Sequence, residues 1–375
     1  MHCYNSNQHE QKTIGKSLML EVKLFDTKQA IKVIESDIPA AKRGGVVVKL
    51  EATPLLSYSR DYLEGKLPYM YPPMPFTPGT NAVGVVHEIG DGVLGLKLGQ
   101  RVIVDCNWVK DEAVSEPERI LIGLTGISMG SAPMLNEYPN GTWRQYGDFP
   151  ASVVFPIDDS DDVDATTLAT IAKLVVPFGG LRRMELKAGE TVLINGASGY
   201  FGSAAVMSAL AMGANVILTG RSQAKLEKVV ADLNAPAERV RVVAQTGEFE
   251  TDVAALRQAF STPAHKALCM VGQSKDSHSS LVSLNALQRG GQLVVMGSTL
   301  AELSIDYNQM LLNNWEIKGN FMYTKEDYLA LISMVQSKQI DLSKIAVKTF
   351  VIDDLENAID EAGQLQGLNS VVLAL

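Results

Sequence analysis

Between residues 165 and 320, short β-branched apolar runs alternate with helix-like segments. Apolar runs of about four to eight residues favour buried strands, and the longer segments between them leave room for helical crossovers. The expected strands are 191–195, 215–219, 239–244, 267–271, 292–296 and 316–319. The expected helices are 202–212, 223–233, 251–260 and 279–288, with a less regular crossover near 305–313. Six strands joined in this way predict an α/β fold with a Rossmann-type, doubly wound parallel sheet.

The earlier part of the chain has a different pattern, in which valine-rich runs are separated by glycine and proline turns. Strands are expected at 46–50, 83–89 and 101–104, and this spacing predicts a β-rich barrel or roll. After the parallel sheet, a helix is expected at 325–336 and a last strand at 370–373. Because this tail is too short to fold alone, we expect it to complete the β-rich domain.

The length of 375 residues exceeds the size at which one core usually stops growing, so about two domains are expected. The predicted division is a β-rich catalytic domain formed by residues 1–164 and 322–375, and a Rossmann domain formed by residues 165–321. The polar start of the chain, 1–16, is expected to be an extension without evident function.

Composition and charge narrow the class of protein. The hydrophobic fraction of 46% and the charged fraction of 20% are those of an ordinary globular protein. A net charge of -9 without a dense Lys/Arg run makes nucleic acid and anionic membranes poor partners. No apolar run approaches the roughly 18 residues that span a bilayer. Three scattered cysteines, Cys3, Cys106 and Cys269, suit a reducing compartment, so we expect a cytoplasmic protein.

A glycine-rich turn joins the first expected strand of the parallel sheet to the first helix. Its candidate dinucleotide-binding residues are Ala197, Ser198, Gly199, Tyr200 and Gly202. A pyrophosphate can lie on the N-terminus of the following helix, where free N–H groups and the positive end of the dipole favour an anion. Gly199 lets the backbone approach the ligand, and Gly202 lets the helix pack closely on the sheet. The alternative is a tight turn that binds nothing.

The end of the second strand distinguishes the two nicotinamide cofactors. An NAD-binding protein usually carries Asp or Glu about twenty residues after the turn. This chain has Gly220, Arg221 and Ser222 there, with Lys225 one helical turn further on. Arg221 and Ser222 can bond to a 2′-phosphate, which favours NADPH. The alternative is that Arg221 only caps a surface loop.

Two further motifs carry a resemblance to a known family. Residues 78–93 read PGTNAVGVVHEIGDGV and residues 98–102 read LGQRV. With the order of the domains, they resemble the medium-chain dehydrogenase/reductase superfamily over most of the chain. The resemblance implies a GroES-like fold for the β-rich catalytic domain. It also implies a set of strand-end residues that line the nicotinamide, for which ordinary turn chemistry is the alternative. These residues are Gly272, Gly297, Ser298 and Asn320.

The zinc-binding positions of the superfamily are changed in this chain. Zinc alcohol dehydrogenases carry Gly-His-Glu where this sequence has Gly79, Thr80 and Asn81, and their earlier cysteine falls on Tyr58. A third ligand is expected within 165–186, a segment without Cys, His or Asp. A catalytic zinc needs three such ligands. The resemblance therefore points to the zinc-independent quinone oxidoreductase and enoyl reductase branches, with no metal.

Without zinc, a protein donor has to stabilise the negative charge that collects on an enolate oxygen after hydride transfer. Tyr58 is the first candidate, because relatives place this position against the nicotinamide and a phenol can donate a proton. Asp61 is the second candidate and would orient the site. Simple packing is the alternative for Tyr58, and a solvated ion pair with Arg60 is the alternative for Asp61.

The sequence therefore predicts an NADPH-dependent, zinc-independent reductase of quinones or of the activated C=C bond of enones and enoyl compounds. A metal-free alcohol dehydrogenase is a second reading, and a protein that binds NADPH without turnover is a third. The expected partners are a small-molecule substrate and, by analogy with relatives, a second copy of the chain in a homodimer.

Overall fold

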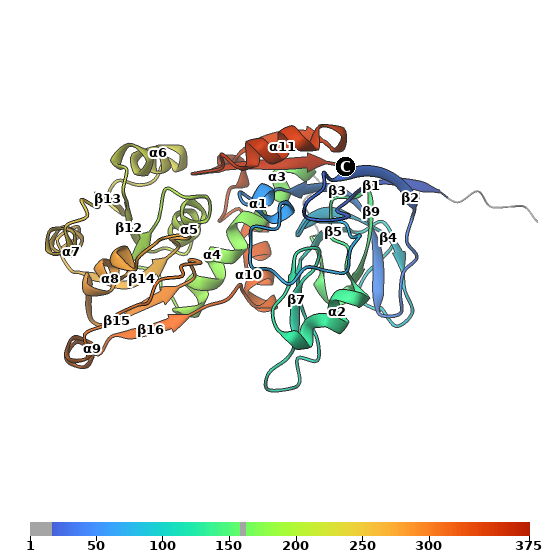
Figure 1. Cartoon of the computed structure of the whole chain (residues 1–375). Coiled ribbons are helices and arrows are strands. Elements are labelled where there is room, and N and C mark those ends of the chain that lie inside the picture. The colour runs from blue at the N-terminus through green and yellow to red at the C-terminus, as the bar shows by residue number, and fades with distance from the viewer. Residues whose placement is uncertain (1–16, 158–162) are drawn as a thin grey trace, which may run out of the picture.

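The computed structural model describes residues 17–157 and 163–375, so the N-terminal extension lies outside the described residues. Figure 1 shows two domains, one α/β and one β-rich, with helices α4 (Ile171–Arg183) and α10 (Lys325–Gln336) between them. The predicted fold class is confirmed. Within the described ranges, the helices are too short or too polar to cross a membrane.

The α/β domain is built on a six-stranded sheet with the order β13-β12-β11-β14-β15-β16, and every neighbouring pair is parallel. Since both faces of such a sheet are covered, its central strand β11 is buried along its whole length. The strands are β11 (Thr191–Asn195), β12 (Asn215–Gly220), β13 (Val240–Ala244), β14 (Ala264–Cys269), β15 (Leu287–Val295) and β16 (Glu316–Gly319). The helices are α5 (Tyr200–Ala211), α6 (Gln223–Leu233), α7 (Phe249–Arg257), α8 (His278–Asn285) and α9 (Tyr307–Asn313).

Two expected strands of the parallel sheet differ from those in the structure by more than one residue at an end. The strand predicted at 267–271 is β14 (Ala264–Cys269), which begins earlier and ends at Cys269, where its pairing with β11 stops. The apolar run continues into the loop, so hydrophobicity alone placed its end too late. The strand predicted at 292–296 begins earlier, at Leu287, because pairing with β14 extends past a glycine pair that the pattern favoured as a turn.

The β-rich domain contains a seven-stranded sheet, on which two smaller sheets are set. The main path is β10-β5-β4-β3-β18-β17, and β9 pairs with β3. The strands are β1 (Leu18–Lys23), β2 (Lys32–Asp37), β3 (Gly45–Pro54), β4 (Ala82–Ile89), β5 (Arg101–Val104), β6 (Asn107–Val109), β7 (Arg119–Leu121), β8 (Thr125–Gly126), β9 (Tyr146–Pro150), β10 (Val154–Pro156), β17 (Ala346–Val351) and β18 (Asn369–Ala374). The short helices are α1 (Ser59–Leu63), α2 (Ala132–Glu137), α3 (Ala165–Ala169) and α11 (Leu355–Ala362).

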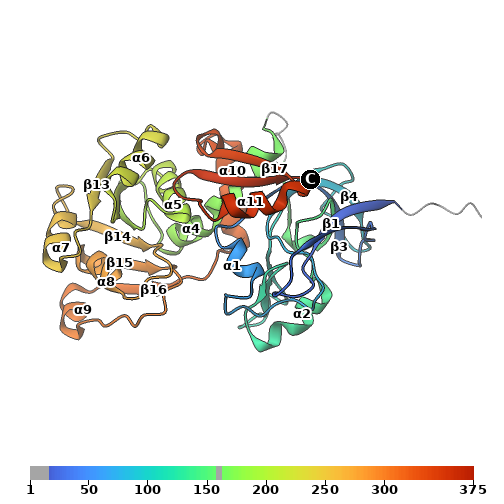
Figure 2. The ribbon, with the colours of Figure 1, turned by 45° about the horizontal axis from the view of Figure 1, so that its top comes forward.

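The C-terminal segment returns to the β-rich domain. β18 pairs antiparallel with β3, opposite Pro54 and Ala52, and β17 pairs with β18. Figure 2 shows α11 and β17 running together from the α/β side to the β-rich side. A shared apolar core also joins the domains, since it contains Val83 and Ile103 of the β-rich domain together with Val192 and Ile194 of β11. The two domains are therefore held together by both chain crossings and packing.

Candidate active site between the two domains

The glycine-rich turn lies where strand β11 ends, at the carboxyl edge of the sheet. Its neighbours β12 and β14 lie on opposite sides, so the turn is at the switch point where open α/β sheets bind ligands. Gly196 has a φ of 81°, a left-handed conformation that favours glycine. Gly196 is not among the residues predicted from the sequence, although a glycine directly after a buried strand is the signal that identifies it.

Helix α5 begins at Tyr200, and its N-terminus is open to a ligand. Gly199 is the N-cap, is exposed, and supplies no side-chain cap. A side chain at Gly202 would overlap the carbonyl oxygen of Gly196, so only glycine allows the helix to begin this close to the turn. Ala197 is buried, and the carbonyl of Ser198 accepts a hydrogen bond from the amide of Gly367 in the C-terminal segment. The first N–H groups of α5 are thus available to an anion such as a pyrophosphate.

The end of β12 lies beside this turn. A Cβ atom built on Gly220 would be 3.8 Å from the Ser198 hydroxyl oxygen. Arg221 is exposed, and Ser222 is the N-cap of α6 without making a side-chain capping bond. Lys225 is exposed in the first turn of α6. The structure therefore brings these four residues to the same corner as the glycine-rich turn, with polar groups that face solvent.

The other half of the sheet edge contains the remaining expected cofactor residues. The amide of Gln273, next to Gly272, donates to the carbonyl of Ser298 over 2.8 Å. A side chain at Gly297 would overlap the carbonyl of Val271, so the loops after β14 and β15 approach closely. The Asn320 amide donates to Val295 over 3.1 Å. The loops after β14, β15 and β16 therefore lie along the same edge of the sheet as the glycine-rich turn, and we call this edge the rim.

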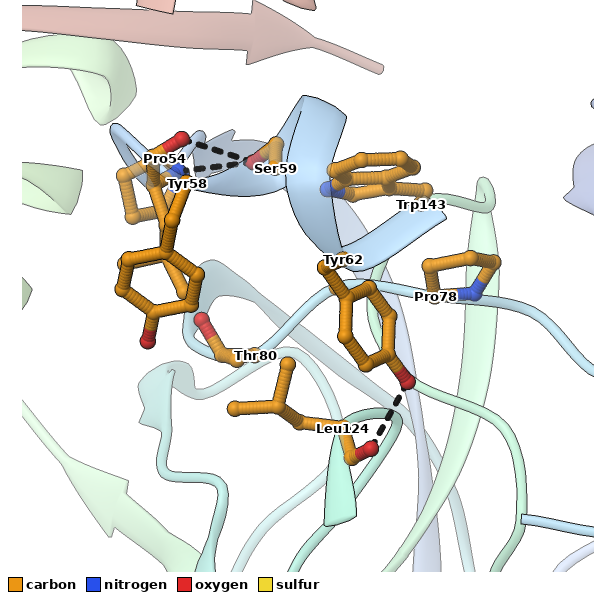
Figure 3. Close-up of a pocket in the computed structure, with 10 residues that line it drawn as sticks. Pro54, Tyr58, Ser59, Tyr62, Pro78, Thr80, Leu124 and Trp143 are labelled. Atoms are coloured by element: carbon orange, nitrogen blue, oxygen red, sulfur yellow. Dashed lines mark hydrogen bonds between the residues drawn. The ribbon is translucent and has the colours of Figure 1, made fainter. Parts of the chain in front are cut away.

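An apolar pocket lies in the β-rich domain. Figure 3 shows the rings of Tyr58 and Tyr62 pointing from the segment around α1 toward Thr80 and Leu124. Tyr62 donates its hydroxyl to the carbonyl of Leu124 over 2.7 Å, which fixes that ring. The lining residues are Pro54, Leu56, Tyr58, Ser59, Tyr62, Pro78, Gly79, Thr80, Leu124 and Trp143.

Tyr58 connects the pocket with the cofactor turn. Its ring packs edge to face on Tyr69, with centroids 6.5 Å apart. Burial raises the pKa of Tyr58 well above its usual range, and the nearby groups of Tyr69, Cys106 and Tyr200 raise this pKa further. The phenol is therefore protonated at neutral pH and can donate a hydrogen bond. Tyr200, one of the groups that raise this pKa, is the first residue of α5.

Asp61 does not join this pocket. It lies on α1, outside the pocket lining, and forms an ion pair with Lys66 over 3.6 Å. Asp61 does not pair with Arg60 either, because Arg60 forms ion pairs with Glu356 and Asp360 on α11. On a short helix these two neighbours point in different directions, which their adjacency in sequence does not reveal.

The pocket walls do not present zinc ligands. Where relatives with zinc carry ligands, this chain places Tyr58 and Thr80, and the lining contains no Cys, His, Asp or Glu side chain. Across residues 17–157 and 163–375, no group of three His, Cys, Asp or Glu residues is arranged to hold a metal ion. The hydroxyl groups of the lining, those of Tyr58, Ser59, Tyr62 and Thr80, are not the Cys, His or carboxylate ligands that usually hold zinc.

A buried polar network lies behind Thr80, and sequence reasoning missed it. Asp105 accepts hydrogen bonds from the Tyr323 hydroxyl at 2.5 Å and from the Asn81 amide at 3.2 Å. The Cys106 thiol donates to Asn81 over 3.7 Å. Burial raises the pKa of Asp105 to about 6, although these donors oppose the rise. Burial also raises the pKa of Cys106, so this thiol is not a nucleophile at neutral pH.

Comparison with known proteins agrees with this geometry. The family model "Alcohol dehydrogenase GroES-like domain" matches residues 42–159, and the model "Zinc-binding dehydrogenase" matches residues 201–337. An alcohol dehydrogenase of Moraxella sp. (strain TAE123) is 28% identical over 345 residues, which cover 92% of this chain and 96% of that protein.

Solved structures share the whole fold. A short chain alcohol dehydrogenase of E. coli CFT073, complexed with NADH, has a TM-score of 0.78 at 16% identity and covers 96% of this chain and 100% of its own. CAD from Helicobacter pylori, complexed with NADP(H), has a TM-score of 0.73 at 14% identity and covers 96% and 98%. At these identities the likeness concerns the fold alone.

The fold is that of a two-domain protein with a GroES-like domain and a Rossmann-type domain. The two family models lie on these two domains in the same order, and the curated relative spans nearly the whole chain. These matches agree with the resemblance to the medium-chain dehydrogenase/reductase superfamily and indicate an oxidoreductase of the alcohol dehydrogenase type.

Proposed function

We propose that this protein is an NADPH-dependent, zinc-independent reductase of quinones or of the activated C=C bond of enones and enoyl compounds. The observation that carries the proposal is the position of Tyr58. A protonated phenol lines an apolar pocket whose walls contain no metal-ligating side chain. This arrangement offers a proton donor where a zinc enzyme offers a Lewis acid.

The residues at the sheet edge fit a nicotinamide dinucleotide. The free N-terminus of α5 would hold the pyrophosphate, and the rim from Gly272 to Asn320 would run along the nicotinamide. Arg221, Ser222 and Lys225 would hold a 2′-phosphate, which favours NADPH over NADH. When bound, the cofactor supplies the hydride. The complexes of similar folds with NADH and with NADP(H) support a nicotinamide cofactor.

The protein's own contribution is orientation and proton transfer. The apolar walls, among them Leu124 and Trp143, exclude water and bind the uncharged part of the substrate. As negative charge develops on the carbonyl oxygen, the Tyr58 hydroxyl donates a hydrogen bond to it and then its proton. Loss of that proton leaves a phenolate, which takes a proton back from solvent between turnovers.

A metal-free alcohol dehydrogenase is the second candidate, and the name of the Moraxella relative favours it. Tyr58 would then donate to a ketone oxygen that becomes an alcohol. A protein that binds NADPH without turnover is the third. NADPH oxidation measured over a panel of enones, enoyl thioesters, quinones and simple ketones separates them. Turnover of simple ketones alone supports the second candidate, and tight cofactor binding without any turnover supports the third.

We also propose the domain boundaries, the oligomeric state and the cellular compartment of the protein. The strand pairing of β18 with β3 supports the boundaries 1–164 with 322–375, and 165–321, for the two domains. The edge strand β16 and the exposed apolar side chains of α9 support a homodimer through this side of the Rossmann domain. Two buried free thiols, Cys106 and Cys269, suit a reducing compartment such as the cytoplasm.

A further inference from the structure

Lys173 is a buried lysine in the middle of α4, next to the cofactor turn. Only 1% of the residue is exposed. Its amine donates to the carbonyls of Gly367 at 2.6 Å and of Asn369 at 3.1 Å. The same amine lies 3.7 Å from the centroid of the Tyr200 ring. Two carbonyls and an aromatic face are partners that compensate a buried amine.

These contacts cross from one domain to the other. Lys173 and Tyr200 belong to the helices that flank β11, whereas Gly367 lies in the loop just before β18. Burial lowers the pKa of Lys173 well below its usual range. A neutral amine still has two N–H groups, one for each carbonyl, so the contact persists in both protonation states.

Gly367 is joined to the glycine-rich turn by two further bonds. The Ser203 hydroxyl donates to its carbonyl over 2.6 Å, and its own amide donates to the carbonyl of Ser198 over 2.9 Å. Its φ of 56° is left-handed, which suits a residue whose two peptide groups face the same neighbours. The loop before β18 is therefore bonded to both ends of the turn that would carry the pyrophosphate.

The same loop leads directly to the substrate pocket. Two residues after Asn369, the carbonyl of Val371 accepts the amide of Leu55 over 2.9 Å. Leu55 follows β3, packs in the core, and precedes Tyr58 by three residues. A short path of hydrogen-bonded backbone therefore runs from the cofactor turn, through Gly367 and β18, to the candidate proton donor.

We propose that Lys173 is a positioning residue that locks the glycine-rich turn to the loop before β18, and so fixes the nicotinamide relative to Tyr58. The inference rests on the proposed function and adds a residue to it. Hydride transfer is sensitive to displacements of about 1 Å, so a side chain that never touches the substrate can control its rate. Lys173 acts through Gly367 and Tyr200, not on the reacting atoms.

The chain offers a matched control for this role. Lys266 is also a buried lysine whose amine donates to two backbone carbonyls, those of Met184 and Glu185. Both partners lie at the end of α4, and Lys266 lies on β14, close to the opposite end of the sheet from the turn. Lys266→Met therefore removes a comparable set of hydrogen bonds without affecting the lock.

The test compares hydrogen exchange of the full-length wild type, Lys173→Met and Lys266→Met, each with and without NADPH. NADPH is expected to slow exchange in residues 363–369 of the wild type and of Lys266→Met, but not of Lys173→Met. With an acceptor from the panel, the single-turnover rate of Lys173→Met is expected to fall at least about tenfold, with the NADPH dissociation constant changed by less than about threefold. If Lys173 only supports stability, folded Lys173→Met shows the same protection of residues 363–369 by NADPH and the same single-turnover rate as the wild type. If Lys173→Met does not fold, Ser203→Ala, which removes the other side-chain donor to Gly367, takes its place.

Three outcomes of this experiment would overturn the proposed lock. Equal protection of 363–369 in Lys173→Met and wild type overturns the lock, whatever the catalytic activity. Protection lost equally in Lys173→Met and Lys266→Met also overturns it, because general destabilisation then explains both. If wild-type protein binds neither NADPH nor NADH, the cofactor assignment fails first and this inference fails with it, and that result is recognisable because it requires no variant.

Discussion

The hydroxyl of Tyr323 donates a hydrogen bond of 2.5 Å to the carboxylate of Asp105, and both side chains are buried. Tyr323 lies on the segment by which the chain returns from β16 to the β-rich domain, and Asp105 directly follows β5. The side-chain amide of Asn107 also donates to the Tyr323 carbonyl over 3.0 Å. The buried carboxylate of Asp105 therefore anchors the segment by which the chain returns to the β-rich domain.

This anchor gives the stability of the protein a defined pH dependence. Because burial raises the pKa of Asp105 to about 6 from its ordinary value of 3.8, the folded state prefers the protonated carboxyl. Its favourable contribution is fully present below about pH 4 and is lost as pH rises through about 6, a change of about 3 kcal/mol.

Asp105→Asn is expected to remove this dependence. Urea unfolding at intervals from pH 4 to pH 7.5 should show the variant gaining stability relative to wild type as pH rises, with the change complete near pH 7. Glu51→Gln, at a more exposed carboxylate on β3, serves as the control and should follow the wild type. A difference between Asp105→Asn and wild type that stays constant with pH contradicts the raised pKa.

Tyr58→Phe tests the proposed proton donor. Removing a general acid typically costs a factor of about 10² to 10⁴, so turnover should fall by at least about a hundredfold while NADPH affinity is kept. Tyr71→Phe is the control, because the Tyr71 hydroxyl bonds to the Tyr62 carbonyl and does not line the pocket. Wild-type rates in Tyr58→Phe would leave Tyr58 with a packing role.

Arg221→Ala tests the choice of cofactor. A hydrogen bond to a charged group contributes about 1.5–3 kcal/mol, so NADPH affinity should fall by about tenfold to a hundredfold while NADH affinity changes little. Lys228→Ala, on the following helix α6 and paired with Asp232, should alter neither affinity. Fluorescence titration with both cofactors measures the effect. An unchanged NADPH preference in Arg221→Ala would exclude this residue from 2′-phosphate recognition.

Chelation tests the proposed independence from zinc. Since Tyr58 and Thr80 occupy the pocket positions of two ligands, dialysis against 1,10-phenanthroline should leave turnover and melting temperature unchanged. A zinc-dependent alcohol dehydrogenase of the same fold, treated in parallel, provides the positive control. Activity that disappears with chelator and returns with Zn²⁺ would show that a metal takes part.

The proposed homodimer is tested on α9. Tyr307, Leu311 and Leu312 are 80%, 62% and 64% exposed beside the edge strand β16, which is unusual for large apolar side chains. Replacing both leucines with Asp should convert a dimer into a monomer in sedimentation experiments. Leu94→Asp, at a fully exposed turn of the β-rich domain, should leave the dimer intact. A monomeric wild type would contradict the proposal.

The sequence predicted the Rossmann part well because its signals are local. The strands 191–195 and 316–319 and the helix 223–233 coincide with β11, β16 and α6, because the apolar period and the segment length determine each of them. The glycine-rich turn followed from a strand, small residues and a helix in direct succession.

The pocket and the domain contacts were less predictable because they join residues far apart in the chain. Lys173 meets Gly367, and Asp105 meets Tyr323, through contacts that no periodicity encodes. A buried lysine inside an apolar helix was visible in the sequence as an anomaly, but its partners were not. Asp61 lies near Tyr58 in the sequence, but it pairs with Lys66 and is not among the residues that line the pocket.

Hydride transfer to a carbon–carbon double bond without a metal is tested most directly by supplying NADPH that carries deuterium at the transferred position, with a simple enone and chelator present, and locating the label in the product. We expect deuterium on the carbon β to the carbonyl, with the ketone intact, and loss of this product in Tyr58→Phe. Deuterium on the carbonyl carbon, giving an alcohol, would contradict the proposed reaction.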